Sequence, residues 1–152
     1  MTFRRATEND ILAIVQLMAN DDLGKNRENF QTPLPKHYLK AFEKINADDN
    51  QELMVVENEN YEVIGTFQLT YIQYMSYYGG IRAQIENVMI RKDQRGLGIG
   101  KRMFEWAINR AKERNAHVLQ LTSDKQRPRA IKFYEDVGFI ASHEGMKLHF
   151  KE

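Results

Sequence analysis

A short basic, glycine-rich turn is the segment of this chain whose residue types suggest chemistry most directly. It follows the apolar run Val88-Met89-Ile90 and reads Arg95-Gly96-Leu97-Gly98-Ile99-Gly100-Lys101. Apolar residues at helical spacing begin directly afterwards, so we expect a strand, a glycine turn and a helix in that order. The first N–H groups of a helix lack intrahelical partners, and the helix dipole adds positive charge there. Because glycines let an anion approach the backbone closely, this turn predicts a phosphate-binding site.

The spacing of the turn argues against two common phosphate-binding motifs. A Walker P-loop requires G-x-x-x-x-G-K-[ST], but Arg95 stands five residues before Gly100, and Arg102 follows Lys101. The dinucleotide fingerprint requires G-x-G-x-x-G, and here the third glycine comes one residue early, at Gly100. The pattern that does fit is R-x-x-G-x-G, over residues 95–100.

A second motif lies thirty residues downstream and supports a specific family. The R-x-x-G-x-G turn resembles the pyrophosphate-binding motif of the GCN5-related N-acetyltransferase (GNAT) superfamily, which binds acetyl-coenzyme A. Residues 130–139, AIKFYEDVGF, are similar to the second hallmark of that family, A-x-x-F-Y-x-x-x-G-F. The two motifs and their separation carry the resemblance over residues 81–150. It implies one GNAT N-acetyltransferase domain over residues 1–152.

The resemblance also implies which residues bind the cosubstrate acetyl-CoA. The glycine turn would hold the pyrophosphate, with added charge from its first residue, through Arg95, Gly96, Gly98, Ile99, Gly100 and Lys101. Backbone groups of the preceding strand, at Val88, Met89 and Ile90, would bond the pantetheine arm and the thioester oxygen. Three residues are candidates for contact with the adenosine phosphate, although a solvated surface position is the simpler interpretation of each: Arg91, Lys92 and Arg102. Many family members place asparagine where this chain has Arg127, so Arg127 is expected to contact either a phosphate of coenzyme A or an anionic group of the acceptor.

Acetyl transfer to an amine needs a base and an acid. An alkylamine with a pKa near 10.4 is only about one part in a thousand neutral near pH 7.4, a penalty of about 4 kcal/mol. The resemblance assigns the base to Glu86, whose alternative role is that of a solvated or ion-paired strand residue. It assigns the general acid that protonates the departing thiolate to Tyr134, which could instead serve packing beside Phe133.

The expected function is therefore transfer of acetyl from acetyl-CoA to a primary amine by direct attack. The acceptor would be a small molecule such as an amino acid, polyamine, aminophosphonate or antibiotic. One alternative is an enzyme that acetylates a protein N-terminus or a lysine side chain. The other is a non-catalytic domain that binds acyl-CoA as a sensor. The pattern from Ser123 through Arg127 to Tyr134, followed by Ser142 and His143, is similar to the aminoalkylphosphonate acetyltransferase branch. Dimers are common in the family, so a homodimer is compatible with the resemblance.

The composition narrows the remaining classes of function. The net charge of +1 over 152 residues argues against a nucleic-acid binder held by bulk charge. No cysteine is present, and none of the four histidines has metal-ligand spacing, so no metal site is expected. The N-terminal sequence lacks a signal-peptide apolar region and no apolar run approaches 18 residues, which favours a cytoplasmic protein without a membrane partner.

The hydrophobic pattern predicts a mixed α/β domain. Strands are expected at 2–5, 53–57, 61–72, 81–90, 117–122, and finally at about 139–142 and 145–150. Helices are expected at about 7–20, 35–45, from the glycine turn to 114, and from Pro128 to Gly138. Residues 73–80 are expected to form a hairpin tip with half-buried tyrosines, or an aromatic wall beside a ligand. This order, β-α-α-β-β-β-α-β-α-β-β, matches the GNAT fold, which implies a mostly antiparallel sheet of six to seven strands, splayed in the middle and flanked by about four helices.

Overall fold

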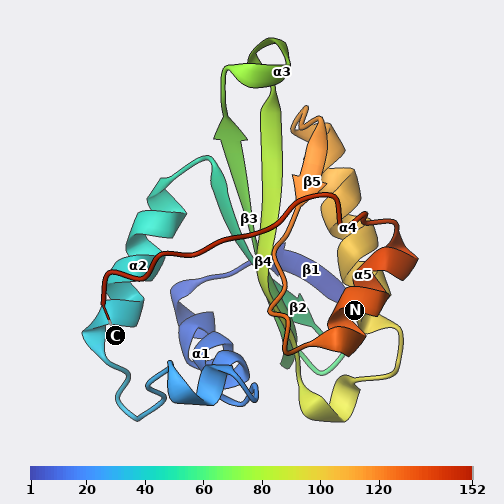
Figure 1. Ribbon diagram of the computed structural model, residues 1–152. Coiled ribbons are helices and arrows are strands. Elements are labelled where there is room, and N and C mark those ends of the chain that lie inside the picture. Colours follow the sequence, from blue (N-terminus) through green and yellow to red (C-terminus); the bar gives the residue numbers. More distant parts are fainter. Residues whose placement is uncertain (152) are drawn as a thin grey trace.

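The fold is built on one twisted sheet of five strands. It is taken from a computed structural model that describes residues 1–151 (Figure 1). The strands lie in chain order: β1 (Thr2–Arg5), β2 (Gln51–Glu57), β3 (Val63–Gln73), β4 (Ile81–Ile90) and β5 (Val118–Gln120). The first four pair antiparallel, and β5 pairs parallel to β4. The predicted mixed α/β class and mostly antiparallel sheet are confirmed.

Five α-helices connect and flank these strands. They are α1 (Ile11–Ala19), α2 (Lys36–Ala47), α3 (Ser76–Gly79), α4 (Ile99–Glu113) and α5 (Pro128–Val137). Local sequence explains several of their ends. The backbone N–H of Thr7 donates to the carboxylate of Asp10 over 2.7 Å, which fixes the entry to α1. Gly138 ends α5 at a φ of +120°, a region that favours glycine.

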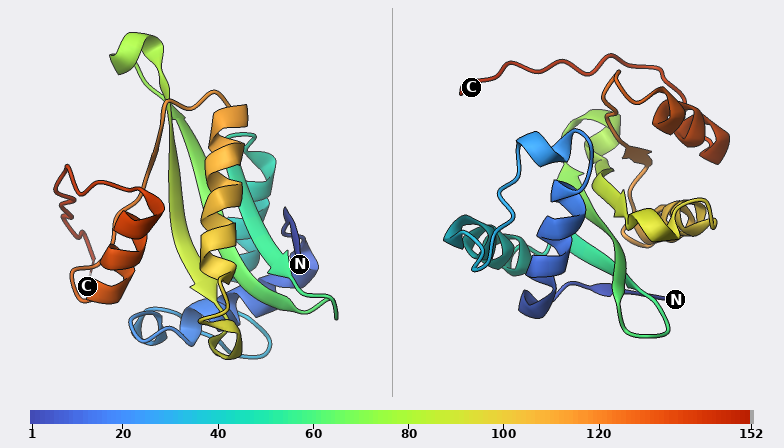
Figure 2. Two further views of the ribbon diagram at one scale, coloured as in Figure 1. Left: turned by 90° about the vertical axis from the view of Figure 1, so that its right-hand side faces the viewer. Right: turned by 90° about the horizontal axis from the view of Figure 1, so that it is seen from below.

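Alternation along β2 divides the sheet into two faces. Met54 and Val56 belong to the core that includes Met103 and Phe104 of α4. Val55 instead packs with Ile14 of α1, in a cluster completed by Ala6, Met18, Phe42, Leu53 and Val63. Because successive strand residues point to opposite faces, α1 and α2 cover one face of the sheet and α4 covers the other (Figure 2). No helix within residues 1–151 has the length and apolar character needed to cross a membrane.

A buried ion pair fixes α4 against β2. The carboxylate of Glu52 is almost fully buried and accepts hydrogen bonds from the guanidinium of Arg110, the shortest at 2.6 Å. It also accepts one from the hydroxyl of Tyr71. Burial alone would raise the pKa of Glu52, but these donors outweigh it and lower the pKa. The contact holds the helix that carries the glycine turn in a defined place on the sheet.

The expected strands at 139–142 and 145–150 are wrong. Beyond Gly138 the described chain is extended but pairs with no strand, and its large side chains are exposed, Ile140 by 84% and Phe150 by 91%. The sheet therefore has five strands instead of six or seven. Apolar alternation indicates an extended conformation, but it does not say which edge, if any, the segment pairs with.

Two further expectations are corrected at the tip between β3 and β4. Residues Ser76–Gly79 form a short helical turn, so there are five α-helices where about four were expected. Of the three tyrosines expected to be half-buried, only Tyr74 is: Tyr77 is 70% exposed and Tyr78 is fully exposed, both with positive φ. The ring of Tyr77 lies 4.5 Å from that of His117, at the start of β5, which keeps this side chain on the outer surface.

Candidate active site

The sheet opens between β4 and β5, where the family resemblance puts the thioester. The two strands pair only from Arg82–Val118 to Gln84–Gln120, although β4 continues to Ile90. Past Gln84, the edge of β4 has no neighbouring strand among the described residues. The backbone of Val88, Met89 and Ile90 therefore belongs to a strand that is open on this side.

A bulge in β4 sharpens this opening. Thr66 of β3 stands opposite Met89, whereas Gln68 stands opposite Glu86, so β4 holds one extra residue between those pairs. Asn87 in the bulge has a φ of +53°, which turns the strand away from regular pairing. The bulge lies directly between Glu86 and the strand segment 88–90. It thus brings a carboxylate next to free backbone groups.

The glycine turn ends at the N-terminus of α4, as the sequence predicts. Gly96 and Gly98 have φ values of +77° and +82°, and a Cβ on either would meet nothing within 4 Å. Glycine is therefore favoured at both positions by the backbone conformation, and the space beside them is open. The first hydrogen bond of α4 runs from the N–H of Arg102 to the carbonyl of Gly98. The N–H groups of Ile99, Gly100 and Lys101 have no partner within the described chain, which leaves three donors for an anion.

Gly100 joins the two sequence motifs in space. A Cβ at this position would lie 3.3 Å from Cζ of Phe133 and 3.4 Å from Cδ1 of Ile90. The start of α4 is thus held against α5 on one side and the end of β4 on the other. Phe133 and its neighbour Tyr134 both pack on Phe104 of α4, with ring centroids 5.7 and 5.5 Å away. The second motif therefore positions the glycine turn as well as carrying the candidate acid.

The basic residues around the turn differ in the hydrogen bonds and ion pairs that they make. Arg91 makes two hydrogen bonds to Asp93 and one to Glu62, so it holds the start of the loop, and these bonds raise its pKa. Arg95 donates from Nε to the carbonyl of Ile90 over 3.0 Å and is otherwise exposed. Lys92 and Arg102 are exposed and have no ion pair within residues 1–151. Positive charge therefore surrounds the free amides, with Arg91 in a structural role.

Arg127 has a partner that the sequence did not suggest. Its Nη1 and Nη2 donate to the two carboxylate oxygens of Asp21 over 2.9 and 2.6 Å. Asp21 is buried and also accepts from the backbone N–H of Gly24, over 3.1 Å. The hydrogen bonds from Arg127 lower the pKa of Asp21. Both terminal nitrogens of Arg127 are thus already bound to a carboxylate of the protein. The expected contact of Arg127 with coenzyme A or the acceptor stays a prediction.

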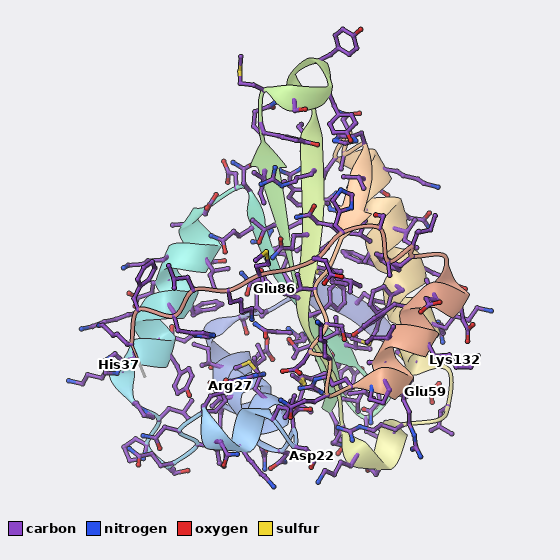
Figure 3. All side chains as sticks on the ribbon, in the orientation of Figure 1. Asp22, Arg27, His37, Glu59, Glu86 and Lys132 are labelled. Atoms are coloured by element: carbon purple, nitrogen blue, oxygen red, sulfur yellow. The ribbon has the colours of Figure 1, made fainter. Side chains whose placement is uncertain are left out.

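Glu86 is the free carboxylate of this region. It is exposed and, within residues 1–151, makes no hydrogen bond or ion pair through its side chain. Figure 3 shows it near the centre of the sheet, between the α1 and α2 side and α5. The ion-paired alternative is therefore not what the structure contains. A carboxylate open to water at this position can accept a proton directly or through a water molecule.

Tyr134 is half-buried, and its hydroxyl bonds to no other described residue. Burial raises its pKa, while the nearby charge of Arg127 acts in the opposite direction. The phenol thus keeps its proton at neutral pH and has it available for donation. Its ring packs between Phe104, Phe133 and Phe139, so the packing role considered from the sequence is also filled.

Sequence reasoning missed a row of amide side chains around Glu86. Gln68 stands directly opposite Glu86, and Gln84 is two residues away on the same strand, so the three share one face. Gln68 donates to Gln51 over 2.8 Å, and Gln120 donates to Gln84 over 3.1 Å. The signal was present as polar residues alternating with buried ones in β3 and β4.

Ser123 was noted in the sequence only as part of a longer pattern. Its hydroxyl, three residues past β5, is buried and has no partner within the described chain.

Comparison with known proteins agrees with this geometry. The model of the acetyltransferase (GNAT) family matches residues 17–139. An aminoalkylphosphonate N-acetyltransferase of Salmonella typhimurium is 25% identical over 140 residues, which are 92% of this chain and 85% of that protein. An L-methionine sulfoximine/L-methionine sulfone acetyltransferase of Pseudomonas paraeruginosa is 26% identical over 127 residues, 81% of this chain and 71% of that protein.

A solved structure shows a greater similarity. The crystal structure of a transcriptional regulator from Bacillus halodurans C-125 is 50% identical in sequence, with a TM-score of 0.95. The match covers 98% of this chain and 99% of that one. With the family model spanning both motifs, the open β4 edge and α5, this chain belongs to the acetyltransferase (GNAT) family.

Proposed function

We propose that this protein is an N-acetyltransferase that uses acetyl-CoA to acetylate a small, polar primary amine. The observation that carries the proposal is the free N-terminus of α4, where three N–H groups follow two glycines in the left-handed region. A pyrophosphate is the anion that the family resemblance implies for this turn. Membership of the family supports an acetyltransferase, and the donor and acceptor are our proposal.

The open edge of β4 supports the placement of the thioester. A pantetheine arm carries amide groups, which would bond the free backbone of Val88 and Ile90 in place of a strand. With the pyrophosphate at residues 96–101, the thioester would lie along this edge beside the bulge. Glu86 and Tyr134 would then border the reacting carbon from β4 and α5.

The proposed reaction is a direct transfer. The neutral amine nitrogen attacks the thioester carbon, and the C–N bond forms as the C–S bond breaks. Glu86 accepts the proton that the amine must lose, directly or through water, and passes it to solvent. Tyr134 donates a proton to the departing sulfur. The backbone N–H of Val88, on this open edge, would stabilise the negative charge on the thioester oxygen.

The amide row supports a small and polar acceptor. Gln68 and Gln84 flank Glu86 with groups that both donate and accept hydrogen bonds. The two named relatives act, by their names, on an aminoalkylphosphonate and on methionine sulfoximine or sulfone. Each of these compounds is an amine with a second strongly polar group. We therefore propose the same class for this chain, with the amino group near Glu86.

A second candidate follows from the name of the 50% identical structure. That protein is described as a transcriptional regulator, which fits an acyl-CoA-binding domain without turnover. Such a domain would keep the free amides of α4 and would not need Glu86.

A thiol-release assay with an amine panel separates the two candidates. The panel contains an aminoalkylphosphonate, methionine sulfoximine, methionine sulfone, a polyamine and a lysine peptide. We expect release of free coenzyme A and a product heavier by one acetyl group with at least one of the first three. Acetyl-CoA binding without turnover of any amine would favour the sensor, and turnover of the peptide alone would favour protein acetylation.

A further inference from the structure

Arg82, near the start of β4, is a half-buried arginine whose charge is unpaired. Its side chain makes no hydrogen bond or ion pair within residues 1–151, and its Nε is buried without a partner. Every other half-buried arginine of the described chain forms an ion pair with a carboxylate; these are Arg4, Arg91, Arg110, Arg114 and Arg127. Because withdrawing a cation from water is costly unless it is paired, Arg82 is a candidate for binding an anion from outside the chain.

The neighbours of Arg82 explain why it has no partner. It stands opposite Ile72 of β3 and Val118 of β5, whose side chains accept no hydrogen bond. Its guanidinium lies over the ring of Tyr74, 4.6 Å from the centroid. Tyr74 is held in turn by a hydrogen bond between its hydroxyl and Nε2 of His117. Stacking uses the flat face of a guanidinium and does not occupy its N–H donors, so the cation is fixed in place with donors to spare.

Arg82 shares a face of the sheet with the proposed base. Arg82, Gln84 and Glu86 alternate along β4, so their side chains lie on one side, with Gln68 directly opposite Glu86. In Figure 1, β4 runs from the tip at α3 toward the glycine turn, and Figure 3 shows Glu86 near the centre of the sheet. A polar row therefore begins with a cation near the tip, continues through amides and ends with a carboxylate.

The two charges of this row do not neutralise each other. Arg82 and Glu86 lie four residues apart on one strand, so their Cα atoms are separated by about 13 Å. Neither forms an ion pair with the other or with any other described residue. Opposite charges at the two ends of a polar row are complementary to a ligand that carries both charges. With a contact of about 3 Å at each end, the amine and the anion of such a ligand would lie roughly 7 Å apart.

We propose that Arg82 binds an anionic group of the acceptor, such as a carboxylate or phosphonate, while the amine lies at Glu86. The acceptor is then a zwitterion whose two charges are separated by several carbon atoms. This inference rests on the proposed function, because Glu86 marks the end of the row where the amine reacts. Arg82 contacts the acceptor far from the reacting atoms and so determines specificity. A polyamine would bring a second positive charge to Arg82 and is disfavoured.

Steady-state kinetics with matched acceptors test the inference. The probes are γ-aminobutyrate, δ-aminovalerate, ε-aminocaproate and γ-aminopropylphosphonate, and the neutral controls are the amides of the three carboxylates. At least one acid should have a kcat/KM about tenfold or more above that of its neutral control. Arg82→Gln should remove this preference by lowering kcat/KM for the acid, with a change of less than about threefold for the amide.

Two further variants separate recognition of charge from a structural role of the side chain. Arg82→Lys keeps the charge and should retain part of the preference, whereas Arg82→Glu should reverse it in favour of a diamine. Arg129→Gln removes an exposed arginine of α5 that has no ion pair within residues 1–151, and it should leave the preference unchanged. Equal rates for every acid and its neutral control, or a preference that Arg82→Gln leaves intact, would overturn the inference.

Calorimetry in the presence of coenzyme A separates this inference from the proposed reaction, since no acetyl group is present and no turnover occurs. The acid should bind about tenfold more tightly than its amide, and Arg82→Gln should abolish the difference. Such a difference in a protein that acetylates none of the probes would support the anion site and contradict the reaction. Turnover of acids and amides at equal rates, with equal affinities, would leave the reaction and refute the role of Arg82.

Discussion

The guanidinium of Arg127 donates two hydrogen bonds, of 2.9 and 2.6 Å, to the carboxylate of Asp21, which lies 106 positions earlier in the sequence. Asp21 lies in the loop just after α1 and Arg127 precedes α5, so this pair links the α1–α2 loop to the helix that carries Tyr134. The carboxylate is also capped by the backbone N–H groups of Leu23 and Gly24. The loop between α1 and α2 is thereby fixed to the start of α5.

Asp21→Asn should destabilise the fold by about 1–3 kcal/mol, since it leaves a partly buried guanidinium without its charge partner. Chemical denaturation measures the change. Lys132→Ala removes an exposed pair with Asp136 on the outside of α5 and should change stability by less than about 0.5 kcal/mol (Figure 3). Equal effects of the two substitutions would contradict the role given to Asp21.

The same pair predicts a pH dependence of stability. Arg127 lowers the pKa of Asp21, so folding favours its charged form. The stabilisation is complete above the unfolded value, about 3.9, and is lost as the pH falls through the lower folded value. Denaturation between pH 2 and 6 should therefore show a steeper loss for the wild type than for Asp21→Asn. Parallel curves would argue against the linkage.

Gly98→Ala should weaken acetyl-CoA binding about tenfold or more. Its φ of +82° strains any L side chain, and a shift of the turn would move the free N–H groups of α4. Calorimetry gives the Kd. Gly79→Ala is a matched control, because Gly79 also has a positive φ and open space around it but lies at the β3–β4 tip. A loss of affinity in Gly79→Ala, with none in Gly98→Ala, would mean that acetyl-CoA does not bind at the glycine turn.

Glu86→Gln should lower kcat by about 10²–10³-fold at neutral pH, with little change in the Kd for acetyl-CoA. The remaining rate should rise with pH as more of the amine becomes neutral in solution. Glu59→Gln changes an equally exposed acid on the β2–β3 turn and should be silent (Figure 3). An unchanged rate and pH profile for Glu86→Gln would exclude the base role.

Tyr134→Phe should lower kcat about 10–100-fold without a matching loss of acetyl-CoA affinity. Its hydroxyl bonds to no described residue, so the free energy of unfolding should change by less than about 0.5 kcal/mol. Steady-state kinetics and denaturation separate the acid role from the packing role. Full activity in Tyr134→Phe would exclude the acid role and leave packing as the role of this side chain.

Local patterns were sufficient for the part of the site that is local in sequence. The strand, glycine turn and helix around Gly98 were predicted correctly, since the turn residues and the periodicity are properties of one continuous segment. The pairing of Asp21 with Arg127 had no such signal, because it depends on the packing of distant elements. The strands expected after Gly138 failed for a related reason. Alternation at Met146, Leu148 and Phe150 indicates an extended conformation but does not specify a neighbouring strand.

The central claim is that this chain acetylates a small amine from acetyl-CoA at Glu86, and one measurement tests it most directly. Purified protein is mixed with acetyl-CoA and the amine panel, and free thiol and acetylated product are quantified together. The account predicts equal amounts of coenzyme A and N-acetyl product with a small polar amine, and strong loss of both in Glu86→Gln. Failure to bind acetyl-CoA, or turnover that is unaffected by Glu86→Gln, would contradict it.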